Sequence, residues 1–130
     1  MRMRIVMLGA LVYWGYSPLL QAQDAVKVDA KHYSVVSENA QVRILKVHYG
    51  AHEKSIMHSH PATVAVFLSD GKGKFTFPDG KSQDFAVKAG DAMYSAASTH
   101  LPENTGEQPL DLIVIELKGK SAKAGKAAAK

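Results

Sequence analysis

The 130-residue chain contains no cysteine, and this absence removes several kinds of chemistry at once. Disulfides, thiolate nucleophiles, cysteine-ligated zinc or iron–sulfur sites and lipid-modified cysteines are all excluded. Any metal site must therefore use histidine, carboxylate or backbone ligands. A hydrophobic content of 46% with 22% charged residues excludes a wholly disordered chain, and the length suits one domain with or without tails.

The central part of the chain has no excess of basic charge, although the formal net charge of the whole chain is +4. Seven of the 16 basic residues lie at the two ends: Arg2, Arg4, Lys118, Lys120, Lys123, Lys126 and Lys130. Residues 24–117 hold the other nine and all 12 acidic residues, so this span has a net charge of about −3. A nucleic-acid-binding domain needs a basic face, so we expect no nucleic acid partner.

The apolar run at the N-terminus is too short to span a membrane comfortably, which takes about 20 residues. It covers the ten residues Ile5–Trp14, follows Arg2 and Arg4, and precedes a segment with small and polar residues. This order predicts a secretory signal peptide over residues 1–23, cleaved near Ala22 or Gln23. The mature protein would then be periplasmic or secreted, with no stable membrane anchor. An uncleaved anchor and a buried first helix are the alternatives.

The C-terminal residues 118–130 contain only Lys, Ala, Gly and Ser. They offer no apolar surface to bury, so we expect a solvated, disordered tail. The folded domain is therefore expected over residues 24–117.

Short runs rich in Val, Ile, Phe and Tyr, separated by turn residues, indicate β-strands in this domain. The clearest turn is Pro78-Asp79-Gly80, which predicts a hairpin between Lys74–Phe77 and Lys81–Phe85. About eight short strands with no helices between them predict an all-β sandwich or barrel. The expected strands are His32–Ser37, Gln41–Tyr49, Ile56–His60, Thr63–Ser69, Gly73–Phe77, Ser82–Val87, Asp91–Ser95 and Leu110–Leu117.

The triplet His58-Ser59-His60 is the most informative local pattern. On a strand, side chains alternate between faces, so His58 and His60 would point the same way. Two neutral imidazoles on one face can share a metal ion. Such a triplet is also common on protein surfaces, so it needs support from the rest of the chain.

That support comes from a resemblance to the cupin family over about residues 41–117. His58, His60 and Gly71 match positions of the first cupin motif, and Gly90, His100 and Asn104 resemble the second. The resemblance implies a double-stranded β-helix, or jelly roll, in a single domain. It also implies a metal held by His58, His60 and His100.

The chain departs from the family pattern at the glutamate ligand of the first motif, where Val64 stands. Three neutral imidazoles leave the full 2+ charge on a metal, which favours anionic or enolate-like chelates and activates bound water. Imidazole suits Fe(II), Zn, Ni or Cu, so the divalent metal stays unidentified. All-histidine cupin sites resemble those of diketone-cleaving and thiol dioxygenases.

Position in the sequence predicts further residues around the ligands. Asn104 is expected to orient the His100 ring, with a turn at Asn104-Thr105-Gly106 as the alternative. The other expected pocket residues are Val64, Tyr94, Phe75 and Met93. Glu103 is expected in a solvated loop, and His32, His48 and His52 are not expected among the ligands.

Three hypotheses follow for function. The first is a dioxygenase-like metal enzyme that acts on a small chelating molecule. The second is a non-catalytic periplasmic barrel that binds a metal or small ligand, since no general acid or base stands out. The third is an interaction barrel with vestigial histidines. A homodimer is the expected oligomeric state, because edge strands of jelly rolls commonly pair.

Overall fold

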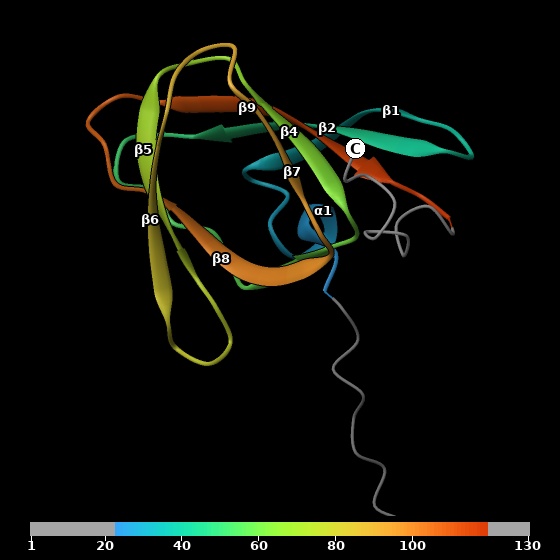
Figure 1. Ribbon diagram of the computed structural model, residues 1–130, viewed down its shortest axis with the longest axis horizontal. Coiled ribbons are helices and arrows are strands. Elements are labelled where there is room, and N and C mark those ends of the chain that lie inside the picture. The colour runs from blue at the N-terminus through green and yellow to red at the C-terminus, as the bar shows by residue number, and fades with distance from the viewer. Residues whose placement is uncertain (1–22, 120–130) are drawn as a thin grey trace, which may run out of the picture.

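The computed structural model describes residues 23–119 as two antiparallel β-sheets facing each other across a shared interior (Figure 1). The bounds are α1 Ala25–Val28, β1 Tyr33–Glu38, β2 Val42–Tyr49, β3 His58–His60, β4 Thr63–Phe67, β5 Gly71–Thr76, β6 Ser82–Val87, β7 Ala92–Ser95, β8 Ser98–Asn104 and β9 Leu110–Leu117. The jelly-roll prediction is confirmed. Nearly all of the expected signal peptide (1–23) and of the expected tail (118–130) lie outside the described residues.

The larger sheet has the strand order β1-β2-β9-β4-β7, and the smaller has the order β3-β8-β5-β6. Figure 1 shows β8 on the side of the molecule opposite β2 and β9. The hairpin predicted at Pro78-Asp79-Gly80 joins β5 to β6, and Gly80 takes the positive φ of 84° that this turn requires. Within residues 23–119, no helix is long and apolar enough to cross a membrane.

The core lies between the sheets and is built from alternate residues of β2 and β9. On β9 the buried positions alternate with half-buried ones along the whole strand. The inward side chains include Leu45 and Val47 on β2 and Leu112 and Val114 on β9. Each such burial stabilises the fold by about 1.5–3 kcal/mol. The central position of β9, between β2 and β4, explains why its sequence is apolar on both faces.

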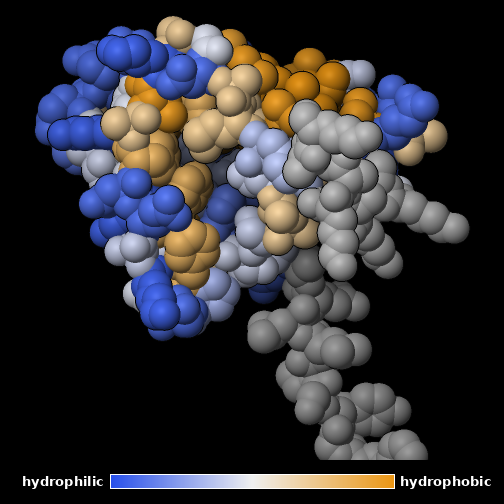
Figure 2. Space-filling model, viewed as in Figure 1, coloured by the Kyte–Doolittle hydropathy of each residue, from blue (hydrophilic) through white to orange (hydrophobic). Residues whose placement is uncertain are grey.

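The outer face of the larger sheet is also apolar. Ile44, Ile115, Val64 and Tyr94 stand opposite one another in register across β2, β9, β4 and β7. Figure 2 shows hydrophobic side chains gathered where β4 and β9 lie in Figure 1. The half-buried state of Ile115 and Val64 shows that neighbours on the same outer face partly cover each other.

The sequence analysis missed one strand and one helical turn. The strand is β8, whose sequence Ser98–Asn104 has no apolar alternation and contains Pro102, a residue that usually marks a strand edge. Pro102 is accommodated opposite Phe75 on β5, and its carbonyl accepts a hydrogen bond from the Ser55 N–H at 2.9 Å. The helical turn is α1, which is capped by the Asp24 carboxylate.

Candidate metal centre

The three histidines meet because β3 pairs with β8. The antiparallel register sets His58 opposite His100, and His60 lies two residues further along the same face of β3. The ring centroids are 4.7 Å apart for His58 and His60, 5.1 Å for His58 and His100, and 5.4 Å for His60 and His100. One nitrogen from each ring lies within 4.8 Å of the others, a group that could hold one metal ion.

Hydrogen bonds fix which nitrogen two of these rings offer. His58 Nδ1 donates to the Ile56 carbonyl at 2.7 Å, and His60 Nδ1 donates to Glu116 Oε1 at 2.8 Å. A carbonyl and a carboxylate only accept, so each Nδ1 carries a proton and Nε2 is the nitrogen left for a metal. The His58 side chain is fully buried, and its Nε2 has no hydrogen-bond partner in residues 23–119. A buried polar atom without a partner is costly, and a bound cation would satisfy it.

Burial keeps two of the histidines neutral. Removal from water, and then the nearby His60, lowers the pKa of His58 from 6.5 to about 4. Burial, and then the charges of His58 and His60, lowers the pKa of His100 to about 3. Neutral imidazole is the form that ligates metals, so these two ligands are ready near pH 7 without losing a proton. The residues present therefore fit a divalent cation.

A chain of charged groups supports His60 from behind. Glu116, only 3% exposed, accepts from His60 and from Arg43 Nε at 2.6 Å. Arg43 also donates to both carboxylate oxygens of Asp24, at 2.9 and 2.7 Å. Burial alone would raise the pKa of Glu116, but the hydrogen bonds from His60 and Arg43 hold it below its usual value. The sequence held one indication that Glu116 matters: it is an acidic residue at one of the alternating positions of β9 that face the interior.

A second buried network lies beside His58. Ser55 Oγ donates to Asp29 at 2.5 Å, and His32 Nδ1 lies 2.8 Å from both Asp29 oxygens. His32 Nε2 is 2.5 Å from Glu53 Oε2, and the His32 ring stacks on Tyr49 at 4.6 Å. His32 is thus a structural residue with two carboxylate partners: Asp29, 3 residues away in the sequence, and Glu53, 21 residues away. The contacts of His32 with Glu53 and Tyr49, and of Ser55 with Asp29, form only when the chain folds, so they could not be predicted from the sequence.

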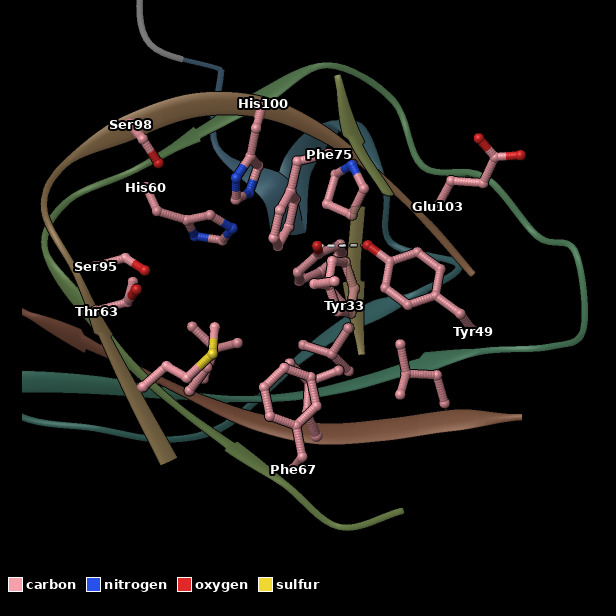
Figure 3. A pocket seen from close by; sticks show the side chains of 18 residues that line it. Tyr33, Tyr49, His60, Thr63, Phe67, Phe75, Ser95, Ser98, His100 and Glu103 are labelled. Atoms are coloured by element: carbon pink, nitrogen blue, oxygen red, sulfur yellow. Dashed lines mark hydrogen bonds between the residues drawn. The ribbon is translucent and has the colours of Figure 1, made fainter. Parts of the chain in front are cut away.

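A cavity of about 70 Å³ opens beside His60 and His100 (Figure 3). Its wall is mainly apolar and aromatic, and the Tyr33 and Tyr49 hydroxyl oxygens lie 2.5 Å apart within it. Burial raises the pKa of Tyr33 well above its usual value, so its hydroxyl is neutral. The lining residues are Tyr33, Val47, Tyr49, His60, Thr63, Ala65, Phe67, Phe75, Phe85, Met93, Ser95, Ser98, His100, Pro102, Glu103, Leu110, Leu112 and Val114.

Two of the predicted pocket residues line this cavity, and two do not. Phe75 stacks on the His100 ring at 4.9 Å and 10°, and Met93 lines the cavity from β7. The pocket positions predicted for Val64 and Tyr94 are wrong: these residues pair with each other on the outer face, and Tyr94 is 56% exposed. The reason is strand alternation, which turns Ala65 and Met93 inward instead.

The role predicted for Asn104 is also wrong, and the turn alternative describes it. Asn104 is fully buried, and its Nδ2 donates to the carbonyls of Tyr49, Gly50 and Gln108 at 3.4, 3.0 and 2.8 Å. Its Oδ1 accepts from the Gly106 N–H at 2.9 Å. All of these partners are loop or strand-end backbone groups, so Asn104 ties the turn after β8 to the end of β2.

The acidic and remaining histidine side chains near the site add no fourth ligand. Glu103 reaches the cavity wall, but Figure 3 shows its carboxylate turned away from the centre, and Lys74 lies 3.6 Å from it. His48 and His52 are exposed and contact Asp111 and Glu107. Within the part of the chain described, the candidate metal group therefore consists of the three histidines.

Comparison with known protein families identifies this arrangement of strands and histidines. The sequence profile of the cupin domain matches residues 43–116. The chain belongs to the cupin family. The matched span of the cupin includes both histidine-bearing strands and most of the two sheets.

Solved structures support the cupin fold. A cupin domain from Bordetella pertussis is 19% identical with a TM-score of 0.62, and the match covers 67% of this chain and 92% of the other. A protein with a double-stranded β-helix domain from Klebsiella pneumoniae is 22% identical with a TM-score of 0.55, covering 68% and 76%. A cupin superfamily protein from Desulfitobacterium hafniense is 17% identical with a TM-score of 0.52, covering 67% and 76%. No curated protein matches the chain.

Proposed function

We propose that this cupin is a metal-dependent, dioxygenase-like protein that binds one divalent ion through His58, His60 and His100 and acts on a small chelating molecule. The observation that carries the proposal is the fully buried His58 Nε2, which has no hydrogen-bond partner among residues 23–119, on a ring that offers one nitrogen within 4.8 Å of nitrogens on the other two rings. When bound, the metal would supply Lewis acidity and positions for the oxygen atoms of a chelate.

Different groups of the protein orient the histidine rings and exclude water from this site. Ile56 and Glu116 hold the Nδ1 protons of His58 and His60, so the free lone pairs keep one direction. Phe75 covers one face of the His100 ring and limits its rotation. The aromatic and aliphatic wall excludes water from the body of a bound molecule.

Elemental analysis of the purified full chain, without a histidine tag, tests the metal centre. We expect about one metal ion per chain after incubation with Fe(II), Zn(II), Ni(II) or Cu(II), and its loss in a His58→Ala/His100→Ala variant. A His48→Ala/His52→Ala variant is the matched control, because both side chains are exposed. Equal metal contents in all three proteins would overturn the proposal.

A non-catalytic binding barrel is the second candidate, favoured by the absence of a carboxylate from the metal group described above. The two candidates differ in turnover. If the iron-loaded protein consumes O₂ with small chelating compounds, it is an enzyme; if it retains metal under chelation without O₂ uptake, it is a binder.

We also propose export and self-association. Residues 1–23 have the charge and apolar pattern of a signal peptide, and mass spectrometry of protein from a cell envelope fraction would show a chain starting near Gln23.

The apolar outer face around Ile115 and Val64 supports a homodimer, which light scattering would detect. A full-length exported chain or a monomer would contradict the respective proposal.

A further inference from the structure

The cavity beside the three histidines has no cationic side chain in its wall. None of its 18 lining residues is Lys or Arg. Arg43, which approaches the site from behind His60, is held by Glu116 and Asp24 and does not line the cavity. Lys74 lies beside the outward-turned carboxylate of Glu103 and is not part of the wall either.

Histidines that ligate a metal do so as neutral imidazoles, so His58, His60 and His100 would add no positive charge of their own to the occupied site. Positive charge would therefore come from the bound metal alone. A chelating head group can use that charge. A second charged group elsewhere in the same molecule would lose its hydration and find no counter-ion in the wall.

The polar and apolar parts of the wall are separated. Figure 3 shows the hydroxyls of Thr63, Ser95 and Ser98 on the side of His60. Elsewhere the wall is mainly aromatic and aliphatic; its other polar groups are the Tyr33 and Tyr49 hydroxyls, which bond to each other, and Glu103, whose carboxylate faces Lys74. Phe75 stacks on Phe85 at 4.7 Å, and Phe67 closes the far side. The volume of about 70 Å³ leaves space for about five to seven water-sized groups.

We infer that the ligand of this site is a small molecule with one chelating head and an uncharged, apolar body, and that molecules with a second charged group are rejected. This inference rests on the proposed metal centre. Beyond the proposed function, it specifies the part of the ligand that does not bind the metal, which the three histidines by themselves do not define. The head lies at the histidines beside the hydroxyls, and the body lies against the Phe75–Phe85 stack.

A matched pair of 2-oxo acids tests the inference, because both present the same chelating head. The compounds are 4-methyl-2-oxopentanoate, with an aliphatic body, and 2-oxoglutarate, with a carboxylate at a similar distance. Each is titrated into the Co(II)-loaded full chain and followed by the cobalt absorption spectrum. Titration of free Co(II) in buffer with the same two compounds gives the ratio of their affinities for the metal when no protein is present. Relative to that ratio, we expect the protein to bind the aliphatic compound at least tenfold more tightly.

A substitution can supply the missing cation. In Met93→Lys, an ammonium group enters the wall from β7, and the preference for the aliphatic compound should fall at least fivefold. Met93→Leu is the control and should keep the preference. The wild-type comparison decides the question even if Met93→Lys fails to fold, which thermal unfolding would reveal. Binding of 2-oxoglutarate as tightly as the aliphatic compound would overturn the inference but leave the metal centre standing. Failure to take up Co(II) would overturn the proposed function itself.

Discussion

His60 and Glu116 link the candidate metal centre to the larger sheet. The histidine donates from Nδ1 to Glu116 Oε1 across 2.8 Å, and the two residues are 8% and 3% exposed. The contact joins β3 of one sheet to β9 of the other, 56 residues apart in the chain. Since Arg43 fixes the other oxygen of the same carboxylate, the orientation of His60 depends on a residue of β2 as well.

Replacing Glu116 should therefore weaken both metal binding and the fold. In Glu116→Gln the amide keeps the size of the side chain but removes the charge that His60 and Arg43 share. We expect a 10- to 100-fold loss of metal affinity and about 3 kcal/mol of stability, measured by metal titration and urea unfolding.

Glu107→Gln is the matched control, because Glu107 is exposed and pairs with the exposed His52. We expect it to change stability by less than about 0.5 kcal/mol. Unchanged metal affinity in Glu116→Gln would show that the carboxylate does not orient His60.

Asn104→Ala should destabilise the protein without affecting the metal centre. The substitution removes the hydrogen bonds that the fully buried Asn104 amide makes to the carbonyls of Gly50 and Gln108, at a cost of about 2–4 kcal/mol in urea unfolding. Metal affinity should stay within about threefold, because the hydrogen bonds of Asn104 go to backbone groups of the turn and β2. Asn39→Ala removes a similar but exposed turn residue and should cost about 1 kcal/mol. A selective loss of metal affinity in Asn104→Ala would restore the role predicted from the sequence.

The metal-free protein should lose stability between pH 6.5 and about 4. His58 and His100 have lowered pKa values of about 4 and about 3 in the folded state, whereas in the unfolded chain they titrate near 6.5. Below pH 6.5 the unfolded chain therefore binds more protons, and stability falls as the pH falls. The slope is about 1.4 kcal/mol per pH unit for each such proton.

Urea unfolding of the metal-free protein at pH 7, 6 and 5 measures this slope. The His58→Gln/His100→Gln variant lacks both groups and should show a flatter dependence. Stability that is constant from pH 7 to pH 5 in the wild type would contradict the burial of neutral histidines.

Phe75→Leu should reduce metal affinity by a few fold and stability by about 1 kcal/mol, because the stack on the His100 ring is lost. Phe77→Leu tests a nearby phenylalanine that does not line the cavity, and it should leave metal affinity unchanged. Metal titrations of the two variants side by side distinguish the contact with His100 from a general effect on the hairpin. Equal affinities would show that the stack does not support the ligand.

The sequence by itself was sufficient for the all-β fold and for the three candidate ligands. Strand alternation is a local property, so the common face of His58 and His60 follows from their spacing. The turn residues Pro78-Asp79-Gly80 likewise predict the hairpin from local sequence alone. His100 was found through the spacing of the family motifs. In contrast, β8 was missed, because its polar residues and Pro102 carry no strand pattern until β3 and β5 pair with it.

Only the tertiary structure decided what surrounds those ligands. Whether Val64 or Ala65 faces the interior depends on the register of β4 against β9, and one residue of register reverses the answer. Glu116 reaches His60, and Asn104 reaches Gly50, across separations of 56 and 54 residues. Such contacts arise from the packing of the two sheets, and no periodic pattern in the chain specifies which residues become partners, so charge, burial and cavity shape at the metal centre come from the folded state.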